Sequence, residues 1–180
     1  GVLDHIVAVK RVDVEHSKAR LPINYLKERI QHLPPTRGFK QALETSTGPA
    51  IIAEVKRASP SKGVLRPDVK PAAFSPENLA RAYERGGAKA LSVLTDTRFF
   101  WGCNELLATI GDATRLPRLR KDFIIDPWQV LESRWLGADA VLLMARCLDP
   151  SSLMELSGLA LEIGLDVLLE VHHDAELEAA

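Results

Sequence analysis

The sequence predicts an α/β fold in which a parallel sheet is covered by helices. From residue 51 onward, short apolar segments alternate with stretches whose apolar residues recur at helical spacing. The short segments are apolar almost throughout, which is typical of parallel strands buried on both faces. Five strands are expected, at residues 51–56, 90–94, 118–124, 140–144 and 167–171.

Helix signals lie between and before these strands. Ser75 is the expected N-cap of a helix that starts at Pro76 and stops at Gly86-Gly87. A helical prelude is expected over residues 3–30, ended by Leu33-Pro34-Pro35. The remaining helices are expected at 104–110, 127–136 and 151–163, with Asp174 as the candidate cap of a further one. This alternation allows two closures of the sheet, an open doubly wound sheet or a barrel.

Composition narrows the class of protein. The 180 residues suit one domain with a real core, and 23 Lys plus Arg balance 24 Asp plus Glu, so we expect no nucleic-acid partner. No apolar run approaches the ~20 residues of a membrane helix, and Asp4, His5 and Lys10 argue against a signal peptide. Cys103 and Cys147 lack CxxC spacing, which favours reduced thiols and a cytoplasmic location.

Residues 51–63 carry the clearest chemical signal. Glu54 and Lys56 are two positions apart, so in a strand their side chains project from one face. A Ser-Pro-Ser-Lys-Gly turn follows, and active-site groups tend to gather at such exits from strand to loop. This pair suits acid/base chemistry, and it equally suits an ordinary ion pair.

Charges also interrupt two other expected strands. Lys121 lies in the third strand with Phe123 on the same face, and Glu170 lies in the fifth. Charged side chains are rarely buried unless they are paired or functional. Three strands that direct charges the same way indicate one site at the C-terminal mouth of a barrel. This convergence favours the barrel over the open sheet, and a catalytic role over a structural ion pair.

The motifs around these residues resemble those of a known family. They occur in the order and at the separations found in indole-3-glycerol phosphate synthases, and the resemblance covers essentially the whole chain. It implies a (β/α)8 barrel preceded by an N-terminal helical extension. The matching segments are residues 51–63, 91–96, 119–127, 138–144 and 169–171.

The resemblance implies a carboxy-lyase of tryptophan biosynthesis. Such an enzyme closes the ring of 1-(2-carboxyphenylamino)-1-deoxyribulose 5-phosphate, a small phosphorylated substrate, and releases carbon dioxide and water without a metal or cofactor. By resemblance, Lys121 is the general acid that protonates the substrate ketone. Lys56 and Glu170 match positions implicated in the later proton transfers, with the division between them left open. Glu54 would orient the lysines and balance their charge.

Substrate-binding residues also follow from the resemblance. Ser59 matches a position that contacts substrate in the family. Pro60, Phe100 and Phe123 are expected to form an apolar slot for the aromatic end of the substrate. For each of these apolar residues, core packing is the competing interpretation.

The same resemblance divides the chain into a helical extension, residues 1–48, and a partial barrel, residues 49–180. A complete barrel has eight strands and about 250 residues, whereas this sequence stops after the fifth strand and begins at Gly rather than Met. We therefore expect a fragment whose open sheet edges favour oligomerisation or pairing with another chain. A part-barrel that is silent until a complementary segment joins it is thus an alternative to an active lyase.

Other chemistries have weaker support. A Schiff-base aldolase that uses Lys56 or Lys121 as nucleophile remains a second enzymatic hypothesis. His172-His173-Asp174 suggests a metal site, but adjacent strand residues point opposite ways, so we expect no metal there. Neither GxGxxG nor GxxxxGK[ST] occurs, so no dinucleotide or NTP fingerprint is present.

Overall fold

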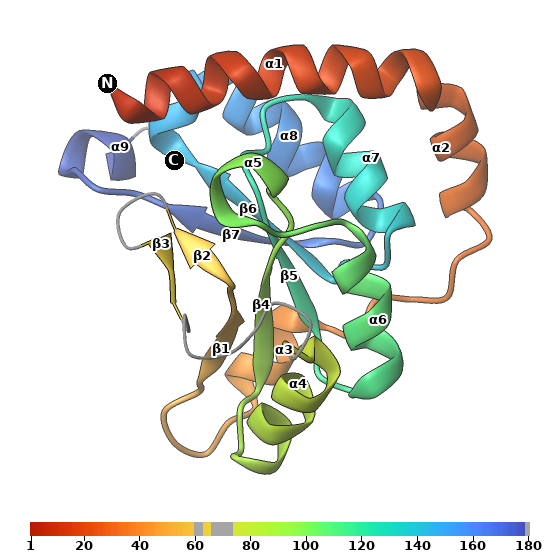
Figure 1. The fold of residues 1–180 in the computed structure, drawn as a ribbon. Helices are drawn as coiled ribbons and strands as arrows, with labels where there is room; N and C mark the ends of the chain where they lie inside the picture. Colours follow the sequence, from red (N-terminus) through yellow and green to blue (C-terminus); the bar gives the residue numbers. More distant parts are fainter. Residues whose placement is uncertain (60–62, 66–73, 179–180) are drawn as a thin grey trace.

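The computed structural model describes residues 1–59, 63–65 and 74–178 (Figure 1). Its centre is a five-stranded sheet with the order β1-β4-β5-β6-β7, in which every neighbouring pair is parallel. The predicted parallel α/β fold is therefore confirmed. The strands are β1 (Ile52–Val55), β4 (Ala90–Leu94), β5 (Arg118–Lys121), β6 (Ala140–Met144) and β7 (Asp166–Glu170).

Helices connect successive strands, and side chains cap the N-termini of three of them. Ser75 caps α4 by accepting a hydrogen bond from the Asn78 amide, and Asp126 and Asp149 cap α7 and α8 in the same way. Each of these three helices starts at a proline, whose missing N–H costs nothing there. The helices that follow β1 are α4 (Pro76–Arg85), α5 (Thr97–Phe100), α6 (Glu105–Ala113), α7 (Pro127–Trp135), α8 (Pro150–Glu162), α9 (Asp174–Glu178) and a 3-10 turn, η2 (Ala145–Cys147).

The N-terminal region is more divided than the sequence suggested. The expected helical prelude over 3–30 is two helices, α1 (Val2–Arg20) and α2 (Ile23–Ile30). Leu21 is extended, at φ −130° and ψ 92°, because the ring of Pro22 disfavours helical geometry in the residue before it. A third helix, α3 (Phe39–Glu44), was not predicted.

This N-terminal region reaches both ends of the sheet. In Figure 1, α1 runs along the end where β4 leads into α5, and α3 lies at the other end. Phe39 of α3 is buried and packs with Ala90, Leu119 and Ala140 near the starts of β4, β5 and β6. The opposite end, where the strands terminate, remains available for polar side chains.

Three expected strands end early, and the fifth strand stops at Glu170 rather than Val171. The first was expected to reach Lys56, but β1 ends at Val55. The third was expected to reach Ile124, but β5 ends at Lys121 because the carboxylate of Asp122 accepts a hydrogen bond from the Phe123 amide at 2.8 Å. Such local side-chain bonds compete with the strand ladder. Phe123 therefore lies in a loop, although it remains next to Lys121.

A short antiparallel hairpin follows β1 and was not predicted. Its strands are β2 (Ala58–Ser59) and β3 (Gly63–Val64). Among the described residues, no helix is long and apolar enough to span a membrane.

Replacing two of the glycines by alanine is expected to have opposite effects on stability. A Cβ at Gly102 would lie 2.2 Å from the carbonyl oxygen of Leu94, so Gly102→Ala must displace backbone and is expected to cost about 1–3 kcal/mol. Gly158 is exposed in the middle of α8 and has nothing within 4 Å of the added carbon, so Gly158→Ala should gain about 0.5–1 kcal/mol. Urea unfolding of both variants checks the pair, and equal effects would contradict the packing described for Gly102.

Candidate active site

One carboxylate joins two lysines at the carboxyl ends of the strands. Glu54 Oε1 lies 2.9 Å from Lys56 Nζ, and Glu54 Oε2 lies 3.0 Å from Lys121 Nζ. Ser92 of β4, the strand between β1 and β5, donates its hydroxyl to Glu54 Oε2 at 3.3 Å. The side chains of Glu54 and Lys121 are 27% and 36% exposed, so the cluster is open to a ligand. The predicted projection of Glu54 and Lys56 from one face is confirmed.

The two lysines set the ionisation of Glu54. Burial raises the pKa of this carboxyl, but the hydrogen bonds and charges of Lys56 and Lys121 outweigh burial and leave the pKa below its ordinary value. Glu54 is therefore a carboxylate at neutral pH. It serves as the charge partner of two ammonium groups, not as a proton donor.

A pH dependence of stability follows from this lowered pKa. A carboxyl with a depressed folded-state pKa stabilises the fold above its unfolded pKa, about 4.3 for glutamate, and loses that contribution as the pH falls through the folded value. The free energies of unfolding of the wild type and of Glu54→Gln should therefore differ most above about pH 5 and converge towards pH 3. Urea titrations across this range test the trend, and a difference that is constant with pH would refute it.

An apolar cavity of about 180 Å³ adjoins this cluster. Lys121 and Glu170, the two catalytic candidates among its lining residues, contribute charged groups. Phe100 and Phe123 also line the cavity, and their ring centroids are 6.2 Å apart. The structure thus brings together four residues that the sequence singled out from β5, β7, α5 and the loop after β5. The other lining residues are Leu94, Asp96, Asp122, Leu142 and Met144.

The remaining predicted site residues lie around this centre. Lys56 does not line the cavity, and it belongs to the site through its ion pair with Glu54. Ser59 is in β2, is half-buried and does not line the cavity. Pro60 falls outside the described residues. Substrate contact by Ser59 and Pro60 therefore stays a prediction.

Glu170 pairs with a histidine just beyond the end of β7. His172 Nε2 lies 2.7 Å from Glu170 Oε1, and both side chains are partly exposed. The sequence suggests His172 only as a metal ligand, together with His173. Within the ranges that the structure describes, no group of three or more His, Cys, Asp or Glu is arranged to hold a metal ion.

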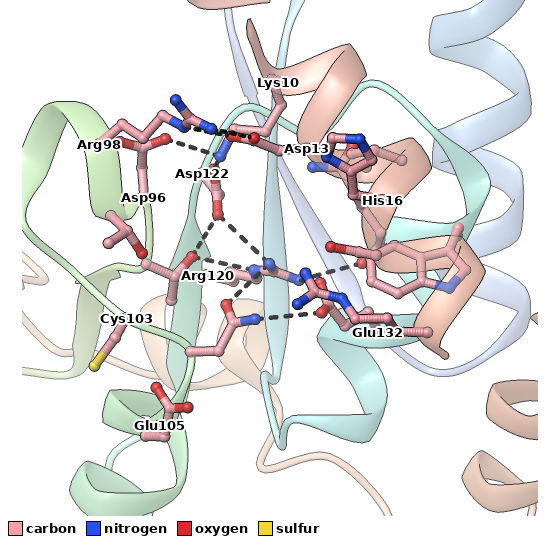
Figure 2. A pocket seen from close by; sticks show the side chains of 18 residues that line it. Lys10, Asp13, His16, Asp96, Arg98, Cys103, Glu105, Arg120, Asp122 and Glu132 are labelled. Atoms are coloured by element: carbon pink, nitrogen blue, oxygen red, sulfur yellow. Dashed lines mark hydrogen bonds and ion pairs between the residues drawn. The ribbon is translucent and has the colours of Figure 1, made fainter. Parts of the chain in front are cut away.

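A buried ionic network on the other side of β5 was missed. Figure 2 shows Arg120 between Asp122 and Glu132, with Lys10 and Asp96 above it. Arg120 Nη1 lies 2.8 Å from Glu132 Oε2, and its side chain is 4% exposed. The network borders a second cavity of about 480 Å³ between α1 and the strand ends. The available signal was the sequence Arg-Leu-Arg-Lys of β5, which places charges on both faces of one strand.

These features define the class of the protein: a partial α/β barrel with a lysine–carboxylate site at the carboxyl ends of its strands. The model of a family described as indole-3-glycerol phosphate synthase matches residues 3–180. The indole-3-glycerol phosphate synthase of Polynucleobacter asymbioticus is 46% identical over 187 residues, covering 99% of this chain and 68% of the relative. The chain belongs to the indole-3-glycerol phosphate synthase family.

Proposed function

We propose that this chain acts as an indole-3-glycerol phosphate synthase through the cluster of Glu54, Lys56 and Lys121. The observation that carries the proposal is one carboxylate bridging two lysines beside a phenylalanine-lined cavity that also contains Glu170. The substrate would be 1-(2-carboxyphenylamino)-1-deoxyribulose 5-phosphate. Family membership supports the lyase activity, and the pathway of tryptophan biosynthesis is implied by the family name.

Lys121 carries the first chemical step. The ring carbon that bears the carboxylate attacks the substrate ketone, a carbon–carbon bond forms, and Lys121 delivers a proton to the ketone oxygen. The carboxylate then leaves as carbon dioxide, and its bonding electrons return to the ring. Glu54, 3.0 Å from Lys121 Nζ, holds the ammonium at the edge of the cavity.

Lys56 and Glu170 carry the dehydration. The new hydroxyl group leaves as water after gaining a proton, and loss of a proton from the carbon between the nitrogen and the former ketone carbon completes the indole. We assign this delivery and removal jointly to Lys56 and Glu170.

The aromatic end of the substrate would occupy the slot between Phe100 and Phe123. An apolar cavity of about 150 Å³ is enough to bind benzene, so about 180 Å³ accommodates one aromatic ring. We further propose that Ser59 and Pro60 contact the substrate from the segment after β1. We also propose that the chain divides into an extension, 1–48, and a barrel portion, 49–180. The placement of α1, α2 and α3 before β1 supports this division. We place the activity in the cytoplasm.

A second candidate role is a part-barrel that becomes active on joining a complementary segment. The order of the described sheet leaves β1 and β7 at its ends, and every residue of β7 is partly exposed.

The Schiff-base alternative has less support. Imine formation needs a neutral amine, whereas Lys56 and Lys121 are both paired with an ionised carboxylate.

The decisive experiment is a fluorescence assay for indole-3-glycerol phosphate, run on this chain alone and after mixing with the last third of the Polynucleobacter relative. Turnover by the chain alone supports the lyase, and turnover only on mixing supports the part-barrel. Borohydride trapping of a substrate–lysine adduct would support the Schiff-base mechanism instead. A folded chain that is inactive in both arms contradicts the proposed function.

A further inference from the structure

Lys10 of α1 is a buried cation held between two carboxylates. Its Nζ lies 2.8 Å from Asp96 Oδ2 and 2.8 Å from Asp122 Oδ1. The Lys10 side chain is 11% exposed, and those of the two aspartates are 2% and 4% exposed. Figure 2 shows this group at the border of the larger cavity, beneath α1.

Each carboxylate organises one loop of the candidate active site. Asp96 Oδ1 accepts a hydrogen bond from the Phe99 amide at 2.7 Å and so caps α5, the helix that carries Phe100. Asp122 Oδ1 accepts one from the Phe123 amide, and Asp122 directly follows Lys121. Both aspartates also line the smaller cavity, whereas Lys10 does not. They therefore form the partition between the two cavities.

We propose that Lys10 is a positioning residue that fixes Phe100, Lys121 and Phe123 around the substrate cavity by holding Asp96 and Asp122 together. The inference rests on the proposed function and deepens it, because it gives α1 a part in shaping the site. Lys10 does not line the substrate cavity, and it acts through the two aspartates alone.

Electrostatics explain why a cation is needed there. Burial alone lowers the pKa of Lys10, but Asp122 and Asp96 raise it overall, so the ammonium is charged at neutral pH. Among the described residues, Lys10 is the cation that forms an ion pair with Asp96, whereas Asp122 also faces Arg120 at 3.4 Å. Without Lys10, Asp96 would be an uncompensated buried charge close to a second carboxylate. The loops that carry the two aspartates must then separate or admit water.

The test compares Lys10→Met with Lys18→Met, a second lysine of α1 that pairs with Asp126, the cap of α7. Hydrogen exchange of the backbone amides is measured by NMR in the full chain. In Lys10→Met we expect exchange at Phe99 and Phe123 to accelerate at least tenfold, with Trp128 unchanged. In Lys18→Met we expect faster exchange at Trp128, because Trp128 donates its amide to Asp126. Exchange at Phe99 and Phe123 should then be unchanged. Lys10→Arg, which keeps the charge, should restore most of the protection.

This readout needs no turnover, so an inactive wild type would contradict the proposed function and leave the positioning role measurable. In an active wild type, kcat per folded molecule should fall at least tenfold in Lys10→Met and stay unchanged in Lys18→Met. Unchanged exchange at Phe99 and Phe123 would overturn the proposal, and so would equal acceleration at Leu142 in β6. Should Lys10→Met not fold, Asp96→Asn serves instead: faster exchange is expected at Phe99 but not at Phe123, and unchanged exchange at Phe99 would refute the role.

Discussion

Lys121→Met is expected to lower turnover by about 10²–10⁴-fold while the chain stays folded. Methionine keeps most of the length of the side chain but removes the only group at this position that can donate a proton. Lys121 is 36% exposed at the end of β5, so the change leaves no deeply buried gap. Its loss also frees Glu54 Oε2 from an ion pair, but Lys56 still neutralises this carboxylate. Initial rates of product fluorescence measure the effect.

The matched control is Lys89→Met, which removes the same group from an exposed position just before β4. It should retain the wild-type rate. Circular dichroism of both variants establishes that the comparison is made between folded chains. A Lys121→Met variant with more than about a tenth of the wild-type rate would remove this lysine from the role of general acid, because positioned proton transfer contributes at least 10²-fold.

Arg120→Met is expected to cost about 3–5 kcal/mol of unfolding free energy. The guanidinium forms ion pairs with Glu132 and Asp122 and donates to the hydroxyls of Thr95 and Ser133. Its removal leaves these buried groups without their common donor. Although Lys10 still faces Asp122, the described partners of Glu132 reduce to the amide of Asn104.

Urea unfolding measures this loss, with Arg98→Met as control. Arg98 pairs with Asp13 across the surface and is 61% exposed, so its replacement should cost at most about 1 kcal/mol. If the slope of the unfolding free energy against urea concentration is the same in both variants, both unfold from the same compact state. Equal losses in the two variants would contradict a special contribution from the buried network.

The five strands of the parallel sheet and the longer helices between them could be predicted because their signals are local. Apolar runs gave the strands of the parallel sheet, and Ser75 and Pro127 marked the starts of helices. The pairing of Glu54 with Lys56 was equally accessible, since it depends only on the two-residue period of a strand. Placing Lys121 and Glu170 beside one cavity required only the further assumption of a common strand direction.

The buried network could not be predicted in this way. Lys10 and Asp96 are 86 positions apart. Lys10 lies at helical spacing between Ile6 and Val14 on the buried face of α1, but nothing local to the helix identifies its partners. Asp122 belonged to an expected strand, yet its side chain binds the next amide and ends that strand. Arg120 faces away from the side of β5 that carries Lys121. These contacts depend on tertiary structure, for which a single sequence carries little information.

The contacts of the N-terminal region also determine the order in which this protein is completed during synthesis. The amide of Lys40 binds the carboxylate of Asp166, which lies 126 positions later in the chain, and Arg37 binds Asp139 across 102 positions. At about 5–20 residues per second, about 6–25 s pass on the ribosome between the addition of Lys40 and that of Asp166. Arg37 and Lys40 therefore cannot complete these contacts until Asp139 and Asp166 have been synthesised.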